Sequence, residues 1–216
     1  RDQLLGAGIE RTGGEDRRFG TVTGSFQMDG QYYITDSAIG TPEVPEDFLF
    51  NGYGQVNYRL GGFQAGMRFE AFQNPLLGIS PQYQGQGIAN RYIGYGTDNF
   101  DVTAGHFYEQ FGSGIALRTY WEPLLGIDNA IDGFRVRGRI LKGGITVKGL
   151  IGRQRYYWSP GPGIVRAGDI EFDVNSLLDS IMPQILTVRF GGSAVSRYLP
   201  DNDPTLNLPT NVASFA

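Results

Sequence analysis

Charged side chains that recur at every second position are the strongest chemical signal in this sequence. The set holds basic residues on two segments and acidic residues on a third: Arg135, Arg137, Arg139, Lys148, Asp169, Glu171 and Asp173. Alternate residues of an extended strand face the same way, so these side chains are expected to share one face of a sheet. One interpretation is a charged pore lining that selects solutes. The other is a mutually neutralising network that braces an interior, and the balance of opposite charges favours it.

Catalytic and metal-binding patterns are weak. His106, the single histidine, has Glu109 nearby, but the chain has no cysteine and no second histidine to complete a metal site. Residues 112–114 (GSG) lack the G-x-S-x-G frame of a nucleophile elbow, and no glycine-rich segment has the lysine of a phosphate loop. Residues 201–203 (DND) could bind calcium, although such clusters are more often turn residues. The sequence therefore predicts no catalytic residue, no cofactor, no metal and no enzymatic activity.

Aromatic pairs and triplets form a third group, placed where the predicted strands meet loops. The group comprises Tyr32, Tyr33, Tyr120, Trp121, Tyr156, Tyr157 and Trp158. Amphipathic rings settle at the headgroup level of a membrane, so an interfacial girdle is one interpretation. A sugar-stacking platform in extracellular loops is the other. The girdle is favoured because two of the clusters adjoin the ends of strands that carry long loops.

Composition limits the elements that can position these residues. The chain has 216 residues, 33 glycines and only 19% charged side chains. Glycine destabilises helix interiors and here follows no three-residue period, so a helical bundle and collagen are excluded. The aromatic content is too high for a disordered polymer, and the net charge of −4 offers no cationic surface for nucleic acid. The composition predicts a β-rich protein.

Alternation of apolar and polar residues predicts about nine strands. They fall near residues 26–34, 55–60, 63–70, 89–97, 100–105, 134–140, 145–151, 169–174 and 186–193. Short turns near 61–62, 98–99 and 142–144 alternate with longer connections near 36–47, 73–88, 110–130 and 158–163. The exception is 175–184, which could hold one helical turn. Glycines inside strands, such as Gly66 and Gly138, are expected where the sheet curves or backbones approach closely.

Short turns at one end and long loops at the other are typical of outer-membrane β-barrels. A strand of about ten residues, tilted by about 40°, rises about 25 Å, which is the height of the apolar band of such a barrel. We therefore predict an all-β, antiparallel, up-and-down transmembrane β-barrel.

Residues 100–157 resemble a family of uncharacterised outer-membrane β-barrel proteins of Bacteroidota. The segments that carry the resemblance are TAGHFYEQFGSG from Thr103, LGIDN from Leu125, and the hairpin KGGITVKG that leads to GRQR. The resemblance covers about a quarter of the chain. It implies a bacterial outer-membrane location and a β-barrel, and it implies no reaction and no catalytic residues.

The expected organisation is an N-terminal lead-in at 1–20, barrel strands over 21–198, and a loop or tail at 199–216. Because single-chain bacterial barrels close with an even number of strands, nine strands predict a part of a larger barrel. The expected function is either a solute-passing pore or a membrane-embedded subunit of a cell-surface assembly. Its expected partners are outer-membrane lipid and other outer-membrane or surface proteins. The alternative is a soluble extracellular β-protein that binds glycans through its aromatic loops.

Overall fold

A computed structural model describes residues 19–36, 38–41, 43–44, 46–177 and 187–199, together with the backbone of 210–215. Its main element is one antiparallel sheet in which each strand pairs with the next along the sheet. The ten strands are β1 (Thr21–Tyr32), β2 (Phe48–Leu60), β3 (Phe63–Gln73), β4 (Gly85–Gly96), β5 (Phe100–Phe107), β8 (Ile131–Ile140), β9 (Ile145–Tyr156), β10 (Ser159–Asp173), β11 (Arg189–Leu199) and β12 (Thr210–Phe215). The all-β, antiparallel, up-and-down arrangement predicted from alternation is confirmed.

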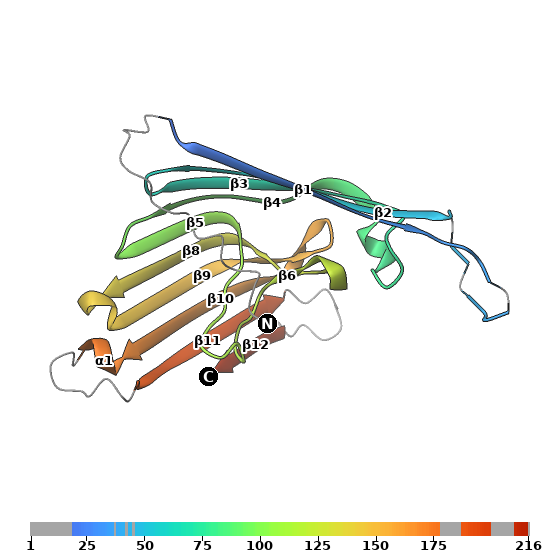
Figure 1. The fold of residues 1–216 in the computed structure, drawn as a ribbon. Coiled ribbons are helices and arrows are strands. Elements are labelled where there is room, and N and C mark those ends of the chain that lie inside the picture. The colour runs from blue at the N-terminus through green and yellow to red at the C-terminus, as the bar shows by residue number, and fades with distance from the viewer. Residues whose placement is uncertain are drawn as a thin grey trace.

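Figure 1 shows that the sheet is strongly bent, with β1–β4 on one side and β9–β12 on the other. A side-chain contact confirms the bend: Arg155 of β9 lies 2.9 Å from Glu70 of β3, although three strands separate β3 from β9 in the sheet. β1 and β12 are the two edges of the sheet, and no pairing joins them in the described part of the chain.

Short elements lie in the connections. A two-stranded hairpin is formed by β6 (Trp121–Glu122) and β7 (Ile127–Asp128), which flank the 3₁₀ helix η2 (Pro123–Leu125). The other short elements are η1 (Pro81–Tyr83), η3 (Leu141–Gly143) and α1 (Val174–Leu177). α1 confirms the helical turn predicted after residue 174. None of the helices in the described residues has the length and apolar composition needed to cross a membrane.

Two of the predicted connections differ from the structure. Residues 158–163, predicted as a long loop, belong almost entirely to β10, and only Tyr157 and Trp158 separate β9 from β10. The prolines and glycines there are accommodated by a shift in register between Pro160 and Ile164, which sequence alternation does not reveal. The predicted tail at 199–216 contains the tenth strand, β12, which pairs antiparallel with β11. The rest of that tail and nearly all of the lead-in at 1–20 lie outside the described residues.

The two faces of the sheet differ in chemistry. Directly opposed residues of neighbouring strands share a face, so Ile93, Ala104, Phe134 and Ile151 form one continuous row. We call the face that carries this row the outward face. Its large apolar side chains are exposed: Phe26, Val56, Met67, Phe69, Ile93, Phe134, Val136, Val147, Ile151, Ile170 and Phe190.

The opposite, inward face carries the polar alternates of the same strands, and its central side chains are buried. A small apolar cluster of Phe107, Phe111, Ile131, Leu150 and Val165 packs there. Close approach explains one of the strand glycines, since a Cβ on Gly66 would lie 2.4 Å from the Tyr92 ring. At Gly138 a Cβ would meet nothing within 4 Å, so close approach does not explain that glycine.

Candidate functional site

A cluster of four buried ions lies against the inward side of β3 and is formed by Arg68 and Glu70 of β3, Asp128 of β7 and Arg155 near the end of β9. Each of these side chains is at most 5% exposed. Glu70 accepts hydrogen bonds from Arg68 Nε at 2.8 Å and from Arg155 Nη2 at 2.9 Å. Asp128 binds both arginines through Oδ2. Two cations and two anions therefore neutralise each other where desolvation of an unpaired ion would be costly.

This ion cluster fixes the segment that connects β5 to β8 against the inward face. Asp128 is contributed by that segment, and so is Tyr108, whose hydroxyl donates a hydrogen bond to Asp128 Oδ1 at 3.0 Å. Arg68 in turn donates to the Tyr108 hydroxyl oxygen. Burial raises the pKa of Tyr108 above its ordinary value, and the carboxylate of Asp128 adds to this effect. The phenol therefore remains a neutral donor at physiological pH.

A second group of ion pairs involves the basic run predicted from the sequence. Arg135 lies 3.2 Å from Asp101 and 3.3 Å from Glu109, and Arg137 lies 3.2 Å from Glu109. Arg139 instead donates to the carbonyl oxygen of residue 98. Asp101 follows the same alternation as the basic run and could have been found, whereas Glu109 lies in a connection where alternation carries no signal.

The acidic run is neutralised separately. Lys148 lies 2.7 Å from Glu171 and 3.3 Å from Asp169, which is directly opposite it in the ladder of β9 and β10. Asp173 pairs with Arg189 at 2.8 Å. The basic and acidic runs thus share the inward side of the sheet, but each is neutralised mainly by other residues. The site that sequence analysis missed is the buried ion cluster, whose members come from three separate elements.

The aromatic residues predicted as a girdle are divided between two environments. Tyr32 and Tyr156 are exposed, as a girdle requires, whereas the others are partly or largely covered. Trp121 lies on the inward side, where the Arg68 guanidinium stacks 3.9 Å from the centre of its ring. Tyr157 packs against the ring of Tyr83, and Trp158 donates to the Tyr83 carbonyl at 2.8 Å.

Of the remaining two predicted girdle residues, Tyr33 is partly buried and Tyr120 is marginally exposed, with the Arg118 guanidinium over its ring. An unbroken outward belt is therefore not formed by the seven residues. Trp121, Tyr157 and Trp158 instead join an aromatic cluster with Tyr53, Phe72 and Tyr83 that supports the connections at this end of the sheet.

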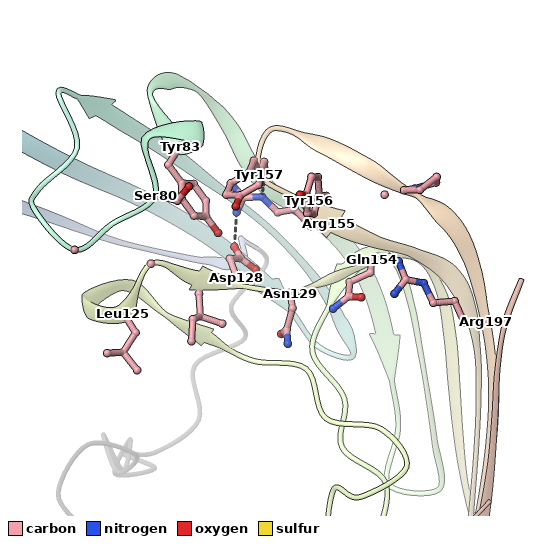
Figure 2. Close-up of a pocket in the computed structure, with 15 residues that line it drawn as sticks. Ser80, Tyr83, Leu125, Asp128, Asn129, Gln154, Arg155, Tyr156, Tyr157 and Arg197 are labelled. Carbon is pink, nitrogen blue, oxygen red and sulfur yellow. Dashed lines mark hydrogen bonds and ion pairs between the residues drawn. The ribbon is translucent and has the colours of Figure 1, made fainter. Parts of the chain in front are cut away.

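A pocket of about 810 Å³ opens beside the ion cluster, between η1, the β6–β7 hairpin and the ends of β9 and β10. Figure 2 shows the amides of Asn129 and Gln154 and the guanidinium of Arg197 along one side, with Tyr156 and Tyr157 near its rim. The Nε atom of Arg197 is buried and has no hydrogen-bond partner among the described residues. The volume falls within the range of small-molecule sites, and the lining is suited to binding polar groups.

The remaining sequence signals are His106 with Glu109 and the possible calcium site at residues 201–203. His106 is buried, and its Nδ1 lies 3.3 Å from the Arg91 carbonyl oxygen and 3.9 Å from Asp132. Glu109 is engaged with the two arginines described above, so the structure does not bring His106 and Glu109 together as a pair. Within the described ranges, no group of three or more candidate ligands could hold a metal ion. Residues 201–203 lie outside those ranges.

Comparison with family models identifies the family of this chain. No curated protein matches the chain. The model of a family of unknown function, DUF6029, matches residues 5–216 and so includes every element described above. The chain therefore belongs to the DUF6029 family.

Proposed function

We propose that this chain forms part of the wall of an outer-membrane β-barrel, with its outward face against lipid. The observation that carries the proposal is the reversed polarity of the sheet. Phe134, Val136 and Ile151 are exposed on one face, while Arg68, Glu70 and Asp169 are buried on the other. In water the opposite distribution is favoured, since apolar area is buried and ions are solvated. In a bilayer, the outward apolar face becomes favourable.

The dimensions of the strands agree with this environment. β2, β4, β9 and β10 have 12 to 15 residues each. Membrane-spanning strands need about 9–11 residues. The exposed apolar rows continue across neighbouring strands from β3 to β10, which is more extensive than the isolated apolar patches of a monomeric protein in water.

Within this proposal, a structural role in a cell-surface assembly is supported better than ion-selective transport. The inward face carries mutually neutralising pairs, whereas a selective pore presents an excess of one charge. The connection between β5 and β8 is also fastened across the inward face by Asp128 and Tyr108. A wide, uniformly charged channel along this face would require these contacts to be released.

The pocket beside Arg197 favours a second candidate function, which is binding of a polar ligand such as a glycan. Its lining combines amide groups and a guanidinium with tyrosine rings. Amides and guanidinium groups bond to hydroxyl and carboxylate oxygens, and aromatic faces pack against apolar sugar surfaces. This activity would be compatible with membrane insertion because the pocket lies where the connections gather.

The lipid-facing assignment can be tested with single cysteines, because the chain has none of its own. Val147 points outward and Thr146, its neighbour on β9, points inward. V147C and T146C proteins, each labelled with an environment-sensitive fluorophore, would be reconstituted in vesicles that contain spin-labelled lipid. We expect strong quenching at position 147 and weak quenching at 146. Equal quenching, or a protein that remains monomeric in buffer without detergent, would contradict the proposal.

Conductance in planar bilayers separates the two roles of a membrane-embedded chain. If the role is structural, the V147C protein that is quenched by lipid should give no stepwise ion-selective currents. Regular conductance steps from the same preparation would overturn the structural role and support a pore.

A further inference from the structure

A charged group interrupts the apolar outward face. By the register of β1–β5 and β8–β11, the exposed or partly exposed outward positions hold four charged side chains, namely Arg91, Asp132, Arg153 and Arg166. They lie on β4, β8, β9 and β10. Because three are cationic and one is anionic, the group carries excess positive charge beside a surface that is otherwise apolar.

Arg153 and Arg166 of this group lie close together on neighbouring strands. Asp132 is directly opposite Arg153, and Arg153 is directly opposite Ile164. Arg166 lies two residues beyond Ile164 on the same face, so Arg153 and Arg166 are diagonal neighbours. Diagonal neighbours in an antiparallel sheet are about 7–8 Å apart, within reach of one ligand for two long side chains.

Protein partners do not neutralise these charges. Arg91 makes a long contact of 3.5 Å with Asp132, and its side chain remains 62% exposed. Arg153 and Arg166 are exposed and form no ion pair with any described residue. Adjacent like charges destabilise a sheet, whereas every arginine of the inward cluster at β3 and β9 is paired with a carboxylate.

We propose that Arg153 and Arg166 form a binding site for the phosphate headgroup of a membrane lipid, while Arg91, separated from them by β5 and β8, adds positive charge to the same face. The inference rests on the proposed lipid-facing role of the outward face and names the lipid group that this face would recognise. The guanidinium group has the fork geometry that binds phosphate through two parallel hydrogen bonds. The adjoining row of Ile93, Phe134 and Ile151 would contact the acyl chains of the same molecule.

The position of these arginines along the strands agrees with binding of a lipid headgroup. The row of His106, Asp132 and Arg153 lies towards the ends of β5 and β8 that the long connection at 108–130 joins, and towards the neighbouring end of β9. The apolar rows follow towards the opposite ends. Long basic side chains at the border of an apolar band extend to the headgroup level while their stems cover apolar surface. A headgroup at this border would meet the guanidinium groups and keep its chains on the apolar rows.

The test compares two lipids with identical acyl chains, phosphatidic acid and phosphatidylcholine, binding to the full chain in uncharged detergent. Native mass spectrometry would report the bound lipid. We expect a preference of at least about tenfold for phosphatidic acid, and the R153Q/R166Q protein should retain less than about threefold, since each arginine near an anionic headgroup contributes about fivefold. R118Q is the matched control, because Arg118 is an exposed arginine on a connection away from this face.

Three results would overturn the proposal: no preference in the unmodified chain, an equal loss of preference in R118Q, or displacement of the lipid by inorganic phosphate as readily as by phosphatidic acid. The last result would indicate a simple anion site.

The R153K/R166K protein keeps the charge but loses the fork geometry, so it should show an intermediate preference. If the label at position 147 is quenched by lipid but no preference exists, this inference fails while the proposed function stands. If neither position 147 nor 146 is quenched, the proposed function itself fails.

Discussion

The two faces of the sheet differ in whether their arginines are paired with carboxylates. On the inward face, Arg68 and Arg155 are almost completely buried, and each is bound to both Glu70 and Asp128. On the outward face, Arg153 and Arg166 are exposed beside apolar side chains and form no ion pair with any described residue. Arginine thus stabilises the folded chain through internal ion pairs on one face, whereas on the other face it is available to bind an external anion.

The largest effect is expected from breaking the inward cluster. D128A would leave two buried guanidinium groups with Glu70 as the single remaining carboxylate, and it would also remove the acceptor of Tyr108. Loss of one partner from a buried ion pair destabilises a protein by about 3–5 kcal/mol. We expect a loss of that size in the free energy of unfolding, measured by denaturant titration in detergent.

D132A is the matched control, because Asp132 is a partly exposed aspartate of the outward face. Exposed ion pairs contribute about 0–1 kcal/mol. Equal effects of D128A and D132A would mean that the two faces do not differ in the way proposed.

The next prediction concerns the outward face. V136R would place a cation in the apolar outward face, opposite Val102 and Gly149 and away from the border at which Arg153 and Arg166 lie. Arginine on the lipid face of a membrane barrel costs about 2–4 kcal/mol near the middle of the bilayer. We expect a loss of this size for folding into vesicles. I115R is the control, since Ile115 is 81% exposed in a connection. If V136R folds into vesicles as readily as I115R, this part of the sheet does not face lipid.

On the inward face, substitution of Arg137, which pairs with a carboxylate, should reduce stability more than substitution of Arg139, which instead donates to a carbonyl oxygen. R137Q would remove one of the two cations that neutralise Glu109, which is itself buried. A buried group left partly unpaired costs about 1–3 kcal/mol. R139Q would lose one hydrogen bond to a carbonyl oxygen at an exposed site and should change stability by less than about 0.5 kcal/mol. Thermal unfolding of both proteins in the same detergent tests the order, and a larger loss in R139Q would contradict it.

Sequence alternation was sufficient for the all-β, antiparallel, up-and-down arrangement because it is a local property of each strand. Phe134, Val136 and Ile140 share one face in the sequence pattern and in the structure. The nine predicted segments all contain a strand, although most strands extend further than predicted. β12 was missed because residues 210–215 (TNVASF) follow proline- and asparagine-rich sequence and are too short to establish alternation.

The candidate sites depend on contacts between distant residues, which local patterns do not contain. Glu70 and Arg155 are 85 positions apart and meet because the sheet bends. Trp121 was predicted in a lipid-facing girdle from its place beside a loop, but the hairpin of β6 and β7 turns its ring towards Arg68. The proximity of Arg153 and Arg166 likewise depends on strand register, which makes them diagonal neighbours.

The last prediction depends on pH and tests whether Tyr108 acts as a neutral donor in the ion cluster. Burial raises the pKa of its phenol in the folded protein above the ordinary value, which is about 10. Stability from this group is therefore fully present below about pH 10 and is lost as pH rises from there through the folded pKa. Y108F should cost about 1.5–3 kcal/mol at neutral pH, because a hydrogen bond to a charged partner is lost. The difference between the two proteins should shrink progressively above about pH 10, when unfolding is measured by denaturant titration at each pH.

Y156F is the control, because Tyr156 is 61% exposed and should give a small, pH-independent change. A difference between Y108F and the unmodified chain that grows with pH would mean that the phenol at position 108 ionises more readily when folded, which is incompatible with its donating to Asp128.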